Sequence, residues 1–245
     1  EIATLLESRD LIRSATAFDI YSRFDSSRNN LQAGGYRLSP SMSSQEILDI
    51  LTAGDVASDL VTILPGQRID QILASLINDA GYDRDAATAA LQANLYTDHP
   101  ALQYKPANAT LEGYLYPESY QRQVGEPVEN VIRQALDQTA LLFDAETLAG
   151  IQAQGLTPHE AVIIASIVEK EVDNLEDKPV VAQVFLKRYK EGIMLGSDVT
   201  ALYGAQVAGM ELAIFADTPY NTRIYTGLTP GPISNISDTA LQAVA

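Results

Sequence analysis

The sequence predicts an α+β fold, in which short strands and amphipathic helices precede a mixed helical and short-strand second half. Two patterns indicate this class. Apolar residues recur at helical spacing over 68–79 and 127–143. A short β-branched run at 61–64 is followed by Pro-Gly, a turn signal. With 245 residues, 46% of them apolar, the chain can bury a substantial core in one large or two smaller domains.

The composition narrows the range of partners and chemistry. A formal net charge of −16 disfavours nucleic acid and adhesion of the folded surface to anionic lipid, because both need a basic surface. A neutral, sugar-like substrate is compatible with it. The chain has no cysteine and only His99 and His159, so we expect no thiol chemistry, no metal and no cofactor. No run approaches the roughly 20 apolar residues of a membrane-spanning helix.

The first 100 residues are predicted to form a small α+β module without clustered reactive side chains. Residues 1–15 are a short helix or an irregular lead. Alternating apolar and polar residues predict a strand over 17–24, and a second strand over 31–39 contains a glycine pair that allows a bulge. Capping and stop signals predict the remaining elements, which are a helix from Ser43 or Ser44 to Thr52, a strand over 61–64 turned by Pro65-Gly66, and helices over 68–79 and 83–94.

A proline-containing loop over 99–109 separates this module from the rest of the chain. We place the domain boundary there, which gives an N-terminal domain of residues 1–100 and a second domain of residues 101–245.

The second domain is organised around a helix that begins at Thr157. Thr157 can cap it, Pro158 suits the first helical position, and Glu160 completes a capping box. Residues 161–168 contain one polar side chain, which is typical of a helix buried on all sides. Glu169 and Glu171 follow. A carboxyl group at the end of a buried helix lies in a partly dry place, which raises its pKa and makes it a candidate proton donor.

This pattern has a simpler interpretation. Buried helices commonly end in charged residues because the chain is leaving the core. Glu169 and Glu171 are also about 200° apart around a helix, so they cannot both face one site as a carboxylate pair. Helix geometry alone does not choose between them.

Three further segments have functional and structural interpretations side by side. Residues 111–120 contain three tyrosines and two glutamates, which suit either a sugar-binding groove or an edge segment that covers a core. In 195–204, Ser197 or Asp198 can simply cap the next helix. The Pro- and Gly-rich segment 217–235 is either a stiff ligand-positioning loop or a packed surface loop. Helices are expected over 127–143, over 180–189 against the central helix with its end at Gly192, and from Asp238.

Four motifs in order resemble one known family. They are Ala165–Glu171, Leu111–Pro117, Ser197–Thr200 with Tyr203-Gly204, and Pro219–Thr222 with Gly227-Leu228 and Pro230–Ile233. Together they resemble the YceG-like family, the MltG endolytic murein transglycosylases of bacteria. Residues 31–38 and 42–54 resemble its N-terminal region, which includes a LysM-like subdomain. The likeness covers nearly the whole chain.

The resemblance implies an activity and its catalytic residue. The family cleaves peptidoglycan strands internally, between N-acetylmuramic acid (MurNAc) and N-acetylglucosamine (GlcNAc), and leaves 1,6-anhydroMurNAc ends. Its catalytic glutamate is the first in the Val-Glu-Lys-Glu motif, here Glu169. That group would act as acid and then base, with a pKa raised from roughly 4.3 toward about 6. The attacking C6 hydroxyl is tethered to the substrate, so a single carboxyl group can suffice.

The remaining candidate residues are assigned to the substrate groove. They are Glu112, Glu171, Ser197, Asp198, Thr200, Tyr203, Tyr220 and Asn221. The sequence departs from the family pattern at Thr229, where a proline is common, and at Arg223, where an aromatic residue is frequent.

The resemblance also implies a location and partners. The family lies at the outer face of the bacterial cytoplasmic membrane, held by an N-terminal helix, and acts on glycan strands beside peptidoglycan synthases of the elongation machinery. This sequence lacks that anchor and ends before the family's last segments, so we expect a piece of a longer protein. Two alternatives remain: a non-catalytic peptidoglycan-binding scaffold, and a hydrolase that pairs Glu169 with Glu112 or Asp198.

Overall fold

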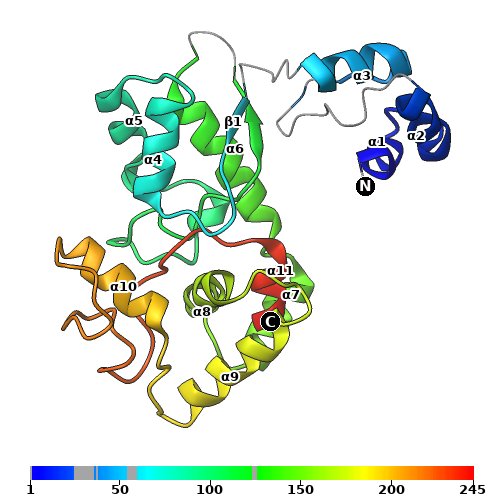
Figure 1. Ribbon diagram of the computed structural model, residues 1–245. Coiled ribbons are helices and arrows are strands. Elements are labelled where there is room, and N and C mark those ends of the chain that lie inside the picture. The colour runs from blue at the N-terminus through cyan, green and yellow to red at the C-terminus, as the bar shows by residue number, and fades with distance from the viewer. Residues whose placement is uncertain (1, 25–35, 37, 54–59, 123–125) are drawn as a thin grey trace. The chain divides into compact units, whose positions relative to one another are not determined.

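The computed structural model describes residues 2–24, 36, 38–53, 60–122 and 126–245 (Figure 1). The chain divides into two compact units, Glu1–Leu60 and Val61–Ala245. Helices dominate both units, and the described strands form one two-stranded sheet. The predicted α+β class is therefore confirmed.

In the described part of the first unit, three helices surround a small core. They are α1 (Ile2–Ser8), α2 (Ala15–Phe24) and α3 (Ser44–Ala53). The core consists of buried apolar side chains from all three helices, namely Leu6, Phe18, Ile47, Leu48 and Leu51. The predicted start of α3 is confirmed, because Ser43 and Glu46 exchange hydrogen bonds of 2.7 and 3.3 Å as a capping box.

The strand predicted over 17–24 is wrong, because these residues lie in α2. Phe18 is buried whereas Ile20 is half exposed, so the apparent alternation does not mark one buried face of a strand. Ser14 supplies the missed start signal, since its Oγ accepts a hydrogen bond from the N–H of Ala17 at 3.3 Å. The strand predicted over 31–39 lies mostly outside the described residues, and its last two residues, Leu38 and Ser39, are not in a strand.

The second unit joins a two-stranded sheet to eight α-helices among the described residues. The strands are β1 (Leu60–Thr62) and β2 (Ser119–Gln121), and the backbone N–H of Ile63 donates to the carbonyl of Glu118. The helices are α4 (Ile69–Asn78), α5 (Arg84–Ala90), α6 (Val128–Leu141), α7 (Ala145–Ala153), α8 (Pro158–Glu171), α9 (Lys178–Lys190), α10 (Asp198–Val207) and α11 (Asp238–Val244), with 3₁₀ turns η2 (Ala93–Tyr96) and η3 (Pro100–Leu102). The sequence interpretation missed α7 and placed one helix where α5 and η2 are separate.

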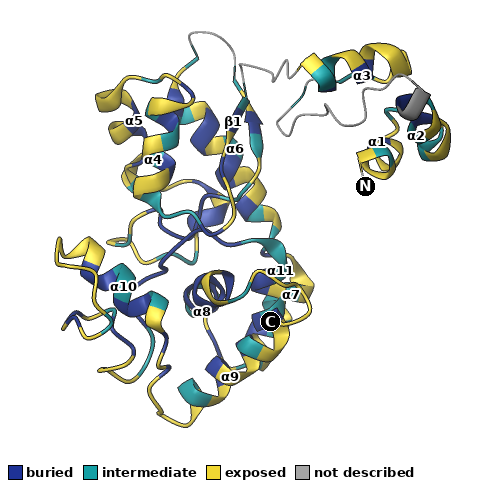
Figure 2. Ribbon diagram, in the orientation of Figure 1, coloured by how far each residue is buried: buried dark blue, intermediate teal, exposed yellow. Residues whose placement is uncertain are grey.

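Helix α8 lies at the centre of the second unit, as predicted. Residues 161–169 are all buried, and α7, α9, α10 and α11 pack against the helix (Figure 2). Its predicted capping box is present: Thr157 Oγ1 accepts from the N–H of Glu160 at 3.3 Å, and Glu160 Oε2 accepts from the N–H of Thr157 at 2.7 Å. Glu169 therefore lies at the end of the buried stretch of α8.

The two compact units do not divide at residue 100, where the sequence boundary was placed. Ile72 and Leu76 share one hydrophobic core with Leu136 and Ile164, so residues 61–100 pack as part of the larger unit. A proline-containing loop marks a chain turn here rather than a break in the core. The functional division into residues 1–100 and 101–245 stays a prediction.

Gly113 provides a test of how tightly the segment before β2 packs on α8. Its φ is +85°, and a Cβ at this position would lie 2.6 Å from Pro232 Cβ and 3.0 Å from Val162 Cγ1. We expect Gly113→Ala to lower the free energy of unfolding by about 1–3 kcal/mol more than Gly81→Ala. Gly81 has a φ of +70° with nothing within 4 Å of the added Cβ, so it isolates backbone strain from the clash. Equal losses in urea denaturation would contradict this packing.

Candidate functional site

The Glu169 side chain is almost completely enclosed and forms three hydrogen bonds through one oxygen. Its exposed fraction is 6%. Oε2 accepts from Lys178 Nζ at 3.1 Å, from the backbone N–H of Ser237 at 3.1 Å and from Ser237 Oγ at 2.5 Å. The prediction that Glu169 lies in a sheltered place at the end of the buried helix is confirmed.

The partners of Glu169 come from two other helices. Lys178 is the first residue of α9, and Ser237 is the N-cap of α11. Lys178 is itself buried, and its Nζ also donates to Ser237 Oγ and Thr239 Oγ1, each at 3.2 Å. Helices α8, α9 and α11 pack against one another, which brings these side chains together.

Sequence reasoning missed Lys178, Ser237 and Thr239. The sequence does contain a start signal at Ser237, because a serine followed by Asp238 is typical of a helix N-cap. It contains no signal that this serine would meet a glutamate 68 residues earlier in the chain.

Glu171 faces a different partner from Glu169, as the 200° separation predicted. Its Oε1 accepts a hydrogen bond from Ser197 Oγ at 2.6 Å. Ser197 occupies the N-cap position of α10, but its side chain makes no capping bond. The interpretation of Ser197 as a capping side chain is therefore wrong. Its side chain links α10 to the end of α8 instead.

Thr200 and Asn221 are fully buried and bond to protein groups. Thr200 Oγ1 contacts Thr222 Oγ1 at 2.7 Å and donates to the carbonyl of Ser197 at 2.8 Å. Asn221 Nδ2 donates to the carbonyls of Ile214 and Ala216, at 3.0 and 2.7 Å. The Thr200 bond fixes the 217–235 loop against α10, and the Asn221 bonds join the start of that loop to the segment just before it.

Glu112 is a second buried carboxyl group, in the segment before β2. It accepts hydrogen bonds from the N–H of Ile69 at 3.1 and 3.2 Å and from Tyr203 Oη at 3.2 Å. Burial raises the pKa of Glu112 to about 7, although these two donors act in the opposite direction. The rings of Tyr203 and Tyr220 lie beside it with centroids 4.8 Å apart. Burial likewise raises the pKa of both tyrosines.

The tyrosines of residues 111–120 divide between the two interpretations. Tyr114 and Tyr120 are buried and cover the core. Tyr116 is partly exposed, and its pKa is raised by burial and then by the charges of Asp238, Glu118 and Glu169. Tyr116 and Asp238 also line a cavity of about 230 Å³. Only Tyr116 therefore brings an accessible aromatic ring close to Glu169 from this segment.

Asp198 forms an ion pair with Arg223, one of the residues that depart from the family pattern. The Arg223 guanidinium also lies 5.9 Å from the centre of the Phe215 ring. The Asp198 side chain remains about half exposed. Neither Asp198 nor Glu112 shares a hydrogen bond with Glu169 among the described contacts, and both are engaged elsewhere.

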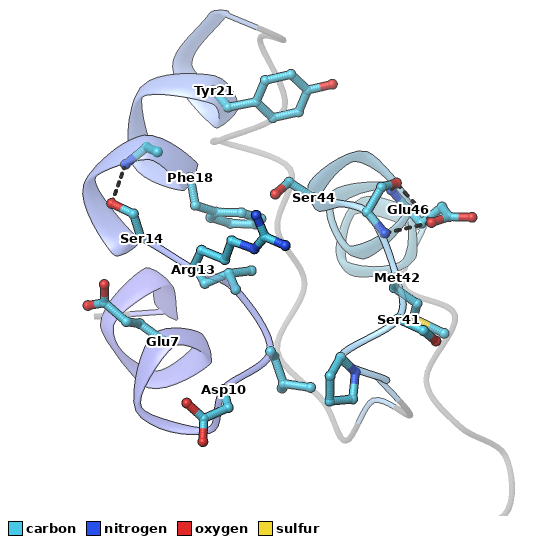
Figure 3. Close-up of a pocket in the computed structure, with 15 residues that line it drawn as sticks. Glu7, Asp10, Arg13, Ser14, Phe18, Tyr21, Ser41, Met42, Ser44 and Glu46 are labelled. Atoms are coloured by element: carbon cyan, nitrogen blue, oxygen red, sulfur yellow. Dashed lines mark hydrogen bonds between the residues drawn. The ribbon is translucent and has the colours of Figure 1, made fainter.

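A larger cavity, of about 920 Å³, lies within the first unit. Figure 3 shows Arg13 and Phe18 on its α2 side and Ser44 and Glu46 on its α3 side. None of the candidate residues predicted from the sequence lines this cavity.

Comparison with known proteins gives relatives along nearly the whole chain. An endolytic murein transglycosylase of Bacillus subtilis is 29% identical over 259 residues, covering 99% of this chain and 71% of the relative. One of Streptococcus pneumoniae R6 is 28% identical over 276 residues, again covering 99% of this chain. The chain spans about half the length of that pneumococcal relative, with 49% covered.

A solved structure and a family model agree with these relatives. The crystal structure of a YceG-like protein from Listeria monocytogenes matches with a TM-score of 0.63 and 28% identity, covering 99% of this chain and 84% of that one. The model of the YceG-like family matches residues 1–245. This chain therefore belongs to the YceG-like family.

Proposed function

We propose that this protein is an endolytic lytic transglycosylase, which cleaves the MurNAc–GlcNAc bond within peptidoglycan strands and leaves 1,6-anhydroMurNAc ends. The observation that carries the proposal is the place of Glu169. Its carboxyl group lies at the end of the buried stretch of α8 and is held by donors from two further helices. The names of the relatives from Bacillus subtilis and Streptococcus pneumoniae support the same reaction.

In the proposed reaction one carboxyl group gives up one proton and then takes up another. Glu169 first donates its proton to the glycosidic oxygen, and the bond from that oxygen to C1 of MurNAc breaks. The C6 hydroxyl of the same MurNAc then bonds to C1, and its proton passes to the Glu169 carboxylate. No water is consumed and the acid is regenerated. Because the nucleophile is tethered to the reacting sugar, no second carboxyl group is required to activate water.

The other candidate residues have two roles in this proposal. Asp198, Tyr203 and Tyr220 are only partly buried, and their hydroxyl groups, ring faces and carboxylate suit hydrogen bonding and stacking with sugars. The second role belongs to side chains that bond to other protein groups, which shape the site by holding α8, α10 and the 217–235 loop. These are Glu112, Glu171, Ser197, Thr200 and Asn221.

We further propose that residues 1–100 form a LysM-like glycan-binding region and residues 101–245 hold the chemistry. The first-unit cavity, with polar and aromatic lining, is compatible with a sugar ligand. The proposed location is the bacterial cell envelope, at the outer face of the cytoplasmic membrane, beside peptidoglycan synthases. Among the described residues, no helix has the length and apolar character needed to cross a membrane.

Product analysis tests this proposal. Purified sacculi incubated with the protein are expected to release fragments whose muramic ends are lighter by one water than hydrolysed ends, because the C6 hydroxyl replaces water as nucleophile. Mass spectrometry after reduction with borohydride separates the two, since anhydro ends resist reduction. Reducible ends would identify a hydrolase. Sedimentation of the protein with sacculi, without any released fragment, would identify a binding protein.

A further inference from the structure

We infer that Lys178 is a positioning residue, which holds Glu169 so that the catalytic proton is carried on Oε1. The inference rests on the proposed function, because it concerns how the same carboxyl group donates and recovers its proton. It is drawn from three features: the unequal bonding of the two carboxyl oxygens, the burial of Lys178, and the charge that forms during the reaction.

The two oxygens of Glu169 have different surroundings. Oε2 receives three donors, from Lys178 Nζ and from the N–H and Oγ of Ser237, at 2.5–3.1 Å. A carboxyl oxygen offers two lone-pair directions, so these donors fill its capacity. No hydrogen bond to Oε1 is found among the described residues. A proton on Oε2 would have to displace a donor, whereas a proton on Oε1 displaces none, so Oε1 faces the glycosidic oxygen.

The Lys178 ammonium is fixed in this arrangement. The side chain is 5% exposed, and its three N–H donors have three acceptors: Glu169 Oε2, Ser237 Oγ and Thr239 Oγ1. A buried ammonium group requires a charged partner, because loss of its hydration is costly. The bonds to Ser237 Oγ and Thr239 Oγ1 do not depend on the charge of Glu169, so they keep the ammonium group beside Oε2 when the carboxyl group is protonated.

The ammonium also stabilises the charge that the reaction creates. When Oε1 releases its proton, the carboxyl group becomes negative, and the Lys178 charge 3.1 Å from Oε2 lowers the energy of that state in a site with little water. Other charged or titratable groups nearby are Asp238 at the start of α11 and Tyr116 before β2. Lys170, the next residue on α8, donates to the carbonyl of Gly66 at 3.1 Å. In the described part of the chain, Lys178 alone forms an ion pair with Glu169.

The experiment compares pH–rate profiles on uncrosslinked glycan strands for the unaltered protein, Lys178→Met, Lys178→Arg and the control Lys190→Met. Lys190 lies at the other end of α9 and donates to Gln154 Oε1, so the control removes the same charge from the same helix. The alkaline limb of kcat/KM reports loss of the donor proton in the free enzyme.

For Lys178→Met we expect the alkaline limb of kcat/KM to move to higher pH by about one unit or more, because the ionised carboxyl group of Glu169 loses the ammonium group that stabilises it. We also expect kcat to fall by at least about tenfold with KM nearly constant, since the acid becomes weaker. Lys178→Arg should return the limb close to its original pH because it keeps the charge. Lys190→Met should leave the whole profile unchanged.

Several outcomes decide the inference separately from the proposed function. The proposed function itself would be overturned if the unaltered protein released no anhydro-ended products. It would also be overturned if Glu169→Gln released them at the normal level. Only the role of Lys178 would be overturned if the unaltered protein is active, Glu169→Gln is inactive, and the alkaline limb of kcat/KM stays at the same pH in Lys178→Met. If circular dichroism shows Lys178→Met to be unfolded, Lys178→Gln takes its place, because glutamine also removes the charge and keeps a side-chain donor. An upward move of the alkaline limb in that variant supports the inference, and an unmoved limb overturns it.

Discussion

Glu169→Gln is expected to abolish release of anhydro-ended fragments from sacculi. Glutamine keeps the size of the side chain and can place its carbonyl oxygen where Oε2 accepts from Lys178 and Ser237. It has no acidic proton to give to the glycosidic oxygen. Loss of a general acid typically lowers a rate by about 10²–10⁴-fold, and here the same group also serves as the base. Quantification of anhydro-muropeptides by mass spectrometry measures the effect.

The same substitution should also destabilise the protein, because it leaves the Lys178 ammonium buried without its counter-charge. Removing one partner of a buried pair typically costs about 3–5 kcal/mol. We therefore expect a lower melting temperature for Glu169→Gln and substantial recovery in the double variant Glu169→Gln/Lys178→Met. Activity should remain absent in the double variant. Recovery of stability without recovery of activity separates the chemical role of Glu169 from its structural one.

Glu171→Gln is the matched control for this prediction. Glu171 lies two residues further along α8 and bonds to Ser197 rather than to the Lys178 network. We expect this variant to keep measurable anhydro product. Normal release by Glu169→Gln together with loss in Glu171→Gln would transfer the catalytic role to Glu171.

The second prediction concerns Glu112 and the pH dependence of stability. Burial raises its pKa to about 7 in the folded protein, against an ordinary value of 4.5 for a glutamate. The folded state therefore binds this proton more tightly than the unfolded state does. The stabilisation from Glu112 is fully present below about pH 4.5 and is lost as pH rises through about 7. A shift of this size corresponds to roughly 3 kcal/mol in the free energy of unfolding.

Glu112→Gln is expected to remove this pH dependence. Glutamine is neutral at every pH and can still accept from the N–H of Ile69 and from Tyr203 Oη. The free energy of unfolding can be measured by urea denaturation at pH 5 and pH 8. The difference between the variant and the unaltered protein should change by up to roughly 3 kcal/mol in favour of the variant from pH 5 to pH 8. Glu118→Gln replaces an exposed glutamate of the same segment and should show no comparable change. Parallel stability curves for Glu112→Gln and the unaltered protein would contradict the argument.

Local signals predicted much of the second unit. The capping box at Thr157 and Glu160 and the apolar run after it gave α8, its burial and the place of Glu169 at its end. These signals are readable because they involve residues within one or two helical turns of each other. The same kind of signal failed at residues 17–24, where a short alternation was compatible with both a strand and α2.

Sequence alone determined that a carboxyl group would end a buried helix, and that Glu169 and Glu171 would face different ways. Only the tertiary structure decided what meets them. Lys178 and Ser237 reach Glu169 because α9 and α11 pack on α8, and Ser197 reaches Glu171 from α10. Contacts of this kind depend on how helices distant in the chain pack together, and helical periodicity specifies which face of a helix is buried but not which side chain lies against it.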